Sequence, residues 1–140
     1  MKNSTSVFPS TSRKNSLFIL RIVMGIIFIS HGVARLYYGS IPYFGAFLDS
    51  LGLMIGEVVA WAITIGEIIG GMLLIMGILT KYAVIFHFAV VLTGIFLVHF
   101  PNGWFVVGHG QNGVEYNILI LAVLILLFTQ TISKPTGKSQ

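Results

Sequence analysis

The sequence predicts an all-α fold, an integral membrane four-helix bundle with interfacial outer loops. Hydrophobic residues make up 56% of the 140 residues and charged residues only 9%, whereas a soluble domain carries about 25% charged residues. In addition, four apolar runs each approach the roughly 20 residues that span a bilayer. The lipid bilayer is therefore the expected surrounding of this chain.

The same composition excludes several function classes. The chain has no cysteine, which excludes disulfides, thiolate metal sites and cysteine-based redox relays within it. Its net charge of +4 comes from scattered basic residues that flank apolar runs. These residues resemble topology signals, and we expect no nucleic-acid partner.

The apolar runs divide the chain into a membrane domain of residues 17–132 and two polar tails, residues 1–16 and 133–140. The first run follows a Ser-rich lead with Arg13 and Lys14. It is too long for a signal peptide and lacks a cleavage site of small residues, so we interpret it as an uncleaved span. The four expected spans are residues 17–36, 58–79, 82–99 and 114–132.

Basic residues outside the spans segregate to one side of the membrane. They occur only in the two tails and in the connection between the second and third spans. With an even number of spans, these segments share one side, which the positive-inside rule places in the cytoplasm. The expected location is the cell membrane, the inner one in a bacterium, with both termini cytoplasmic. These residues are Lys2, Arg13, Lys14, Lys81, Lys134 and Lys138.

The two outward connections, residues 37–56 and 100–113, are rich in aromatic residues and glycine. Aromatic side chains favour the headgroup level of a bilayer. We therefore expect both segments to lie in the interface and cover the bundle, with a short surface helix over residues 44–51.

Charged side chains and glycines share one face of the first span. They follow steps of four, three, four and three residues, so they form a single helical stripe with His31 at its edge. A charge that faces lipid costs about 2.5 kcal/mol or more at mid-depth, so this face is expected to point into the bundle. The stripe consists of Arg21, Gly25, Phe28, Gly32 and Arg35.

The second span carries a carboxylate and a GxxxG step. Glu67 lies near its middle, where an unpaired carboxylate would find a partner or take up a proton. Gly66 and Gly70 are expected at a close helix contact, with the first span as the favoured partner. Replacing Gly70 with leucine should then lower stability.

Depth along the spans predicts which polar groups meet. At 1.5 Å per residue, His31 lies roughly 21 Å and Glu67 roughly 18 Å from the cytoplasmic side, so we expect them to pair. Arg21 could also reach toward Glu67, and Arg35 could instead extend to the headgroups. Secondary polar layers then place Arg21 with His87 near the cytoplasmic side, and Arg35 with His99 and Glu115 near the outer side.

Some of these residues also have simpler interpretations. His87 is expected to be a structural, hydrogen-bonding histidine, and even the His31–Glu67 pair could serve only to lock two helices. The four histidines would allow a haem with two axial ligands, although no spacing requires one. We expect no metal site.

In these segments the chain resembles the DoxX family of small four-span membrane proteins. The likeness rests on LRIVMGIIFISHGVARL in the first span, GEIIGGMLLIMGILTKYA in the second and NGVEYNILIL at the start of the last. It extends from residue 17 to residue 128. A proline that is common in the family after an LG pair is absent at Leu53. Carried over by position, the likeness points to Arg21, His31, Glu67 and Glu115, with Arg35 where the family often has lysine.

The resemblance implies a role in quinone-linked respiratory oxidoreductases or in complexes that handle oxidative stress, or a role as a membrane chaperone. The first hypothesis is therefore an accessory or quinone-interacting subunit that works with redox partner subunits. Arg21, His31 and Glu67 would form its substrate pocket. The alternatives are a small proton-coupled transporter, which would act as a homo-oligomer, and an assembly partner with no chemistry of its own.

Overall fold

The computed structural model describes residues 10–132, and every regular element in this range is helical. Four of the helical segments are long and apolar enough to cross a membrane, which confirms the predicted all-α membrane fold. A π-helical turn, η1 (Ile95–His99), and a 3₁₀ turn, η2 (Phe100–Asn102), extend the fourth helix. The α-helices are α1 (Ser10–Tyr37), α2 (Ile41–Ser50), α3 (Gly56–Met76), α4 (Thr80–Gly94) and α5 (Glu115–Ile132).

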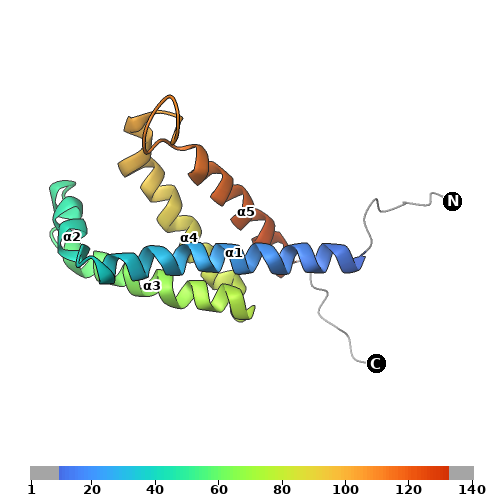
Figure 1. Cartoon of the computed structure of the whole chain (residues 1–140). Helices are drawn as coiled ribbons and strands as arrows, with labels where there is room; N and C mark the ends of the chain where they lie inside the picture. Colours follow the sequence, from blue (N-terminus) through green and yellow to red (C-terminus); the bar gives the residue numbers. More distant parts are fainter. Residues whose placement is uncertain (1–9, 133–140) are drawn as a thin grey trace.

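The helices form two arms that diverge from one end of the molecule (Figure 1). The first arm holds α1, α2 and α3, and the second holds α4 and α5. We call the end where α1 begins and α5 finishes the tail end, and the end with α2 and residues 95–114 the capped end. The arms meet toward the tail end and separate toward the capped end. The bundle is therefore open on one side, unlike a closed four-helix bundle.

Within the first arm, α1 and α3 cross with their backbones in contact. A Cβ on Gly25 would lie 2.6 Å from the carbonyl oxygen of Gly71, and one on Gly32 would lie 2.8 Å from that of Thr64. A Cβ on Gly71 would in turn come within 2.7 Å of the Gly25 carbonyl oxygen. The glycines thus permit a close antiparallel contact of the kind that holds helices together in lipid.

The GxxxG step of α3 faces α4 and not α1, so the predicted helix partner is wrong. A Cβ on Gly66 would meet the Phe86 ring at 2.3 Å, and one on Gly70 would meet the His87 ring at 2.5 Å. Each residue turns an α-helix by about 100°, so Gly66 is about 200° away from the α1-facing Thr64. The glycines of α3 therefore contact two different helices: Gly71 lies against α1, whereas Gly66 and Gly70 lie against α4.

The main apolar core draws on all four long helices and lies toward the tail end. Leu74, Val84 and Leu124 are its most deeply buried members. A smaller cluster joins α2 to the start of α3 through Ile41, Leu48 and Ala60. α2 corresponds to the expected surface helix. Its residue Asp49 accepts a hydrogen bond from the backbone N–H of Gly56 at 2.7 Å, which satisfies a free donor at the beginning of α3.

The orientation of the bundle in the membrane is a prediction that labelling tests. Because the chain has no cysteine, single introduced cysteines report without background. In intact cells, a membrane-impermeant maleimide should label His109→Cys, in an exposed loop at the capped end, and leave Lys138→Cys unlabelled until the cells are opened. Labelling of position 138 from outside would reverse the proposed topology.

Candidate functional site

A two-pronged ion pair connects α1 and α3 inside the membrane domain. Arg35 donates from Nη1 to Glu67 Oε2 at 2.5 Å and from Nη2 to Oε1 at 3.2 Å. The side chain of Glu67 is 5% exposed and that of Arg35 is 20% exposed. The Arg35 guanidinium also lies 5.2 Å from the centre of the Phe44 ring, on α2. Planar bidentate geometry of this kind fixes orientation as well as charge.

This pairing corrects the two predicted pairs, His31 with Glu67 and Arg35 with Glu115 and His99. Side chains tilt toward the N-terminus of their helix, so Arg35 leans from the capped end toward the middle while Glu67 leans toward it from antiparallel α3. α1 and α3 cross at Gly32 and Thr64, and Arg35 and Glu67 lie on opposite sides of this crossing. The Cα atoms of Arg35 and Glu67 are therefore offset along the helix axis by about six residues, roughly 9 Å. A comparison of Cα depths alone does not include the length and tilt of these side chains, so it does not predict this pair.

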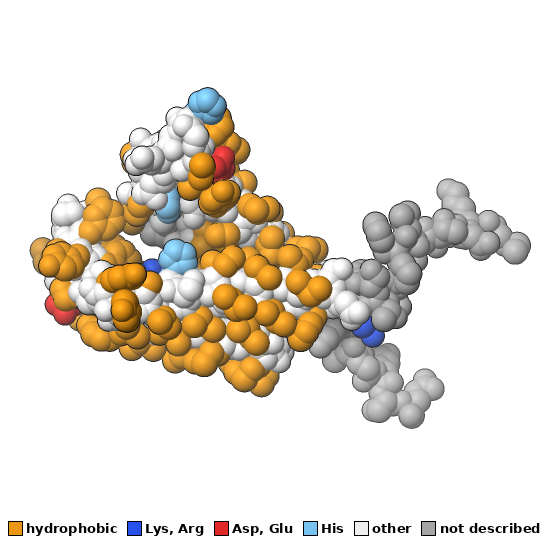
Figure 2. Space-filling view, viewed as in Figure 1, with side chains coloured by type: hydrophobic (Ala, Val, Ile, Leu, Met, Phe, Trp, Pro, Cys, Tyr) orange, Lys and Arg blue, Asp and Glu red, His pale blue; other side chains and the backbone are white. Residues whose placement is uncertain are grey.

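A cavity of about 470 Å³ lies between the two arms on the side of the ion pair. Its wall is mainly apolar, with Phe28 and Phe86 among the aromatic residues that line it. Figure 2 shows a hollow between the arms in which His and Lys or Arg atoms are visible among hydrophobic ones. The cavity is open toward the surroundings, because the arms separate there.

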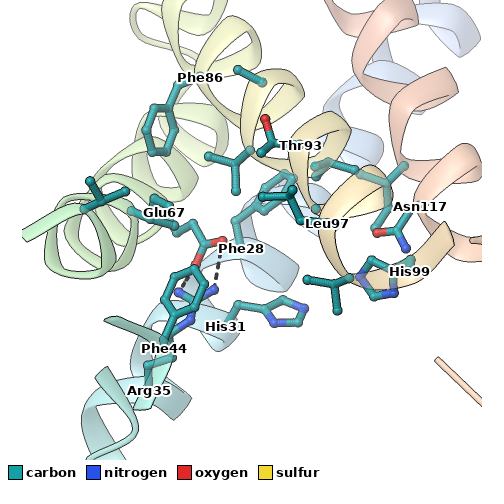
Figure 3. A pocket seen from close by; sticks show the side chains of 18 of the residues that line it. Phe28, His31, Arg35, Phe44, Glu67, Phe86, Thr93, Leu97, His99 and Asn117 are labelled. Carbon is teal, nitrogen blue, oxygen red and sulfur yellow. Dashed lines mark hydrogen bonds and ion pairs between the residues drawn. The ribbon is translucent and has the colours of Figure 1, made fainter. Parts of the chain in front are cut away.

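Polar groups line this cavity from both arms (Figure 3). On the first arm, His31 is one residue before the α3-facing Gly32, hence rotated by about 100° and turned into the cavity beside the ion pair. His31 makes no hydrogen bond or ion pair with any residue from 10 to 132. The polar groups on the second arm are Thr93, His99 and Asn117.

Thr93 and Asn117 line the cavity but are not among the site residues that the sequence predicts. The available signal was their polarity, because each is an uncharged hydrogen-bonding residue within a long apolar segment. The glycine and charge patterns of the sequence instead predict a site formed by α1 and α3.

His99 and Glu115 serve the connection between α4 and α5. His99 Nδ1 lies 2.8 Å from the backbone carbonyl oxygen of Asn112, and the carboxylate of Glu115 accepts from the backbone N–H of Val106 at 2.9 Å. Glu115 also occupies the first turn of α5, where the helix dipole favours an acid. Both residues therefore shape the loop, and neither bonds to Arg35.

Arg21 lies apart from the cavity, near the tail end. A Cβ on Gly77 would come 2.5 Å from Arg21 Nη1, so the guanidinium lies over the left-handed residue that ends α3. A cation is favourable at a helix C-terminus. The Arg21 Nε atom is buried and has no hydrogen-bond partner among the described residues.

His87, on α4, is fully buried and packs against Gly70 of α3 and Phe28 of α1. Its Nδ1–H donates to the carbonyl oxygen of Ala83 at 2.7 Å, and its ring stacks on Phe28 with 3.7 Å between centroids. It does not bond to Arg21, which was its predicted neighbour. These contacts agree with a structural histidine. Across residues 10–132, no three His, Asp or Glu side chains are grouped to hold a metal ion.

This fold and site define a class of protein, namely a multi-pass helical membrane protein with an ion pair beside a ligand-sized cavity. The DoxX family model matches residues 16–100, which is more than half of the chain. The protein therefore belongs to the DoxX family. The match covers the α1–α3 arm and α4, whereas α5 lies beyond it. No curated protein and no solved structure matches the chain.

Proposed function

We propose that this DoxX protein binds the ring of a lipid-soluble quinone in the cavity between its arms, as a quinone-interacting subunit of a membrane oxidoreductase. The observation that carries this proposal is an apolar cavity of about 470 Å³ with His31, Arg35 and Glu67 on one wall. Small-molecule sites have volumes of roughly 300–1,000 Å³ and combine apolar walls with a few polar groups.

The chemistry of this wall suits a carbonyl oxygen. Arginine carries five N–H donors, and Glu67 engages only two of its nitrogen atoms. The carboxylate holds the guanidinium in place, so a donor can face the cavity without a loss of orientation. His31 would add a second donor or acceptor. In this proposal a partner subunit supplies the electrons, and the DoxX chain positions the ring.

The structural alternative has its own support. Arg35 and Glu67 satisfy each other, so their role could be limited to joining α1 to α3 in a protein that assembles a complex. Such a protein would keep its partners without binding quinone. Quinone binding by the isolated chain separates the two functions.

A matched pair of substitutions tests the cavity. Ala89 lines the cavity on α4, and Ala122 is an exposed residue of α5 that does not line it. In nanodiscs, the wild-type chain should bind a short-tailed 1,4-benzoquinone, measured by tryptophan fluorescence quenching. Ala89→Phe should weaken this binding at least about tenfold by filling the space, while Ala122→Phe should leave it unchanged.

The proposal fails if the quinone-depleted wild-type protein shows no saturable binding. Equal effects of the two phenylalanine substitutions would also contradict it, because binding would then not depend on the cavity. If quinone binding fails in either way but the wild-type protein and both variants still co-purify with one common set of partner proteins, the structural alternative is favoured.

A further inference from the structure

The second wall of the cavity, on the α4–α5 arm, carries a hydrogen-bond acceptor of fixed position. His99 lies at the end of η1, and Figure 3 shows its ring next to Asn117, away from Arg35 and Glu67. The Nδ1 atom of His99 lies 2.8 Å from the carbonyl oxygen of Asn112. A carbonyl oxygen can only accept, so Nδ1 carries the proton of this bond.

The tautomer of His99 follows from that bond. A neutral imidazole has one N–H, so its Nε2 has a free lone pair and acts as an acceptor. His99 Nε2 has no hydrogen-bond partner within the described part of the chain, and the residue lines the cavity. In its neutral form, His99 therefore gives the second wall an acceptor beside the hydroxyl of Thr93 and the amide of Asn117, whereas Arg35 on the first wall can only donate.

A quinone and its reduced form differ in how they meet these walls. A quinone has a carbonyl acceptor at each end of its ring, so one oxygen would face the lone pair of His99 Nε2. A quinol has a hydroxyl at each end, which donates its proton to Nε2 at one end and accepts from Arg35 through its oxygen at the other.

We propose that His99 makes the cavity selective for the reduced, hydroxyl-bearing form of the ring, with the hydroxyl hydrogen-bonded to Nε2. The proposal rests on the proposed function, because it assumes that the ring binds in this cavity. His99 is partly exposed in the free protein, and a ring that covers its Nε2 atom would bury it. A buried polar group left without a partner typically changes affinity by about tenfold to a hundredfold. The quinol is expected to bind more tightly than the quinone by at least the lower value.

A conservative substitution isolates the acceptor. In His99→Asn, the side-chain amide keeps an N–H donor near the position of Nδ1, so the bond to the Asn112 carbonyl is retained while Nε2 is lost. The control is His109→Asn, in the same connection, because His109 contacts Phe105 and does not line the cavity. Melting temperatures of both variants check that they fold.

The measurement is the Kd of one short-tailed benzoquinone in its oxidised form and of its quinol under anaerobic conditions, in nanodiscs. Wild type and His109→Asn should prefer the quinol about tenfold or more. In His99→Asn the two affinities should agree within about twofold, through weaker quinol binding.

Equal affinities in the wild type would overturn the selectivity and leave the proposed quinone site standing. A preference that persists in His99→Asn would remove His99 as its cause. If neither form binds to the wild type, the proposed function fails together with this inference. Where His99→Asn does not fold, equal affinities in the wild type still overturn the proposal.

Discussion

Replacing Arg35 with methionine is expected to lower the stability of the protein by about 3–5 kcal/mol, because it strands a buried charge. The Glu67 side chain is 5% exposed and bonds to Arg35 through both carboxylate oxygens. Without the guanidinium, the carboxylate must take up a proton or open the contact between α1 and α3. The melting temperature in a mild detergent measures the effect.

The double variant Arg35→Met/Glu67→Leu is the matched control. It removes both charges and keeps similar volumes, so it should be more stable than Arg35→Met alone. Arg35→Lys should be intermediate, since lysine keeps the charge and loses the planar two-pronged contact. Strictly additive losses from the two single changes would show that the ion pair does not stabilise the fold.

Replacing Gly71 with leucine should have an effect of similar size, by forcing two backbones apart. Even a Cβ at this position would lie 2.7 Å from the carbonyl oxygen of Gly25, and backbone cannot rotate away as a side chain can. Overpacking typically costs about 1–3 kcal/mol, and a whole leucine at a backbone contact should reach or exceed that range. Thermal unfolding in detergent and the yield of monodisperse protein measure it.

Gly94 in α4 provides the control for glycine replacement. Nothing lies within 4 Å of a Cβ built there, so Gly94→Ala should be neutral or stabilise the helix by up to about 1 kcal/mol. Gly70→Leu should fall between the two, because its new side chain would meet the side chain of His87 and not backbone. Equal stability of Gly71→Leu and Gly94→Ala would mean that the α1–α3 contact contributes nothing.

Hydropathy and periodicity were sufficient to predict the elements of the fold. The four long helices and α2 occur close to the residues where apolar runs and aromatic segments placed them. The separation of the arms could not be predicted, because α3 is apolar on almost every side. Such a helix gives no sign of which face meets α1, which meets α4 and which meets lipid. The GxxxG step was consequently assigned to the wrong neighbour.

The site was predicted as a set of residues better than as a set of contacts. Glu67 does lie against the polar face of α1, as the stripe of charged residues and glycines on that helix indicated. The actual partner, Arg35, depends on side-chain tilt and length, which a comparison of Cα depths omits. Arg21, at the other end of the same stripe, contacts the end of α3 and does not reach Glu67.

The unequal packing of the two arms has a mechanical consequence. The α1–α3 contact is made by backbone at three glycines, Gly25, Gly32 and Gly71, and is reinforced by the ion pair, so these helices should move as one stiff body. The α4–α5 arm is attached to it through the contacts of Gly66 and Gly70 with the rings of Phe86 and His87 and through apolar side chains toward the tail end. The chain itself connects the arms through the short turn at Gly77 and Leu79, both in left-handed conformation. Motion of this protein should therefore be a swing of the second arm about that turn. Such a swing would change the width of the cavity while leaving the Arg35–Glu67 geometry intact.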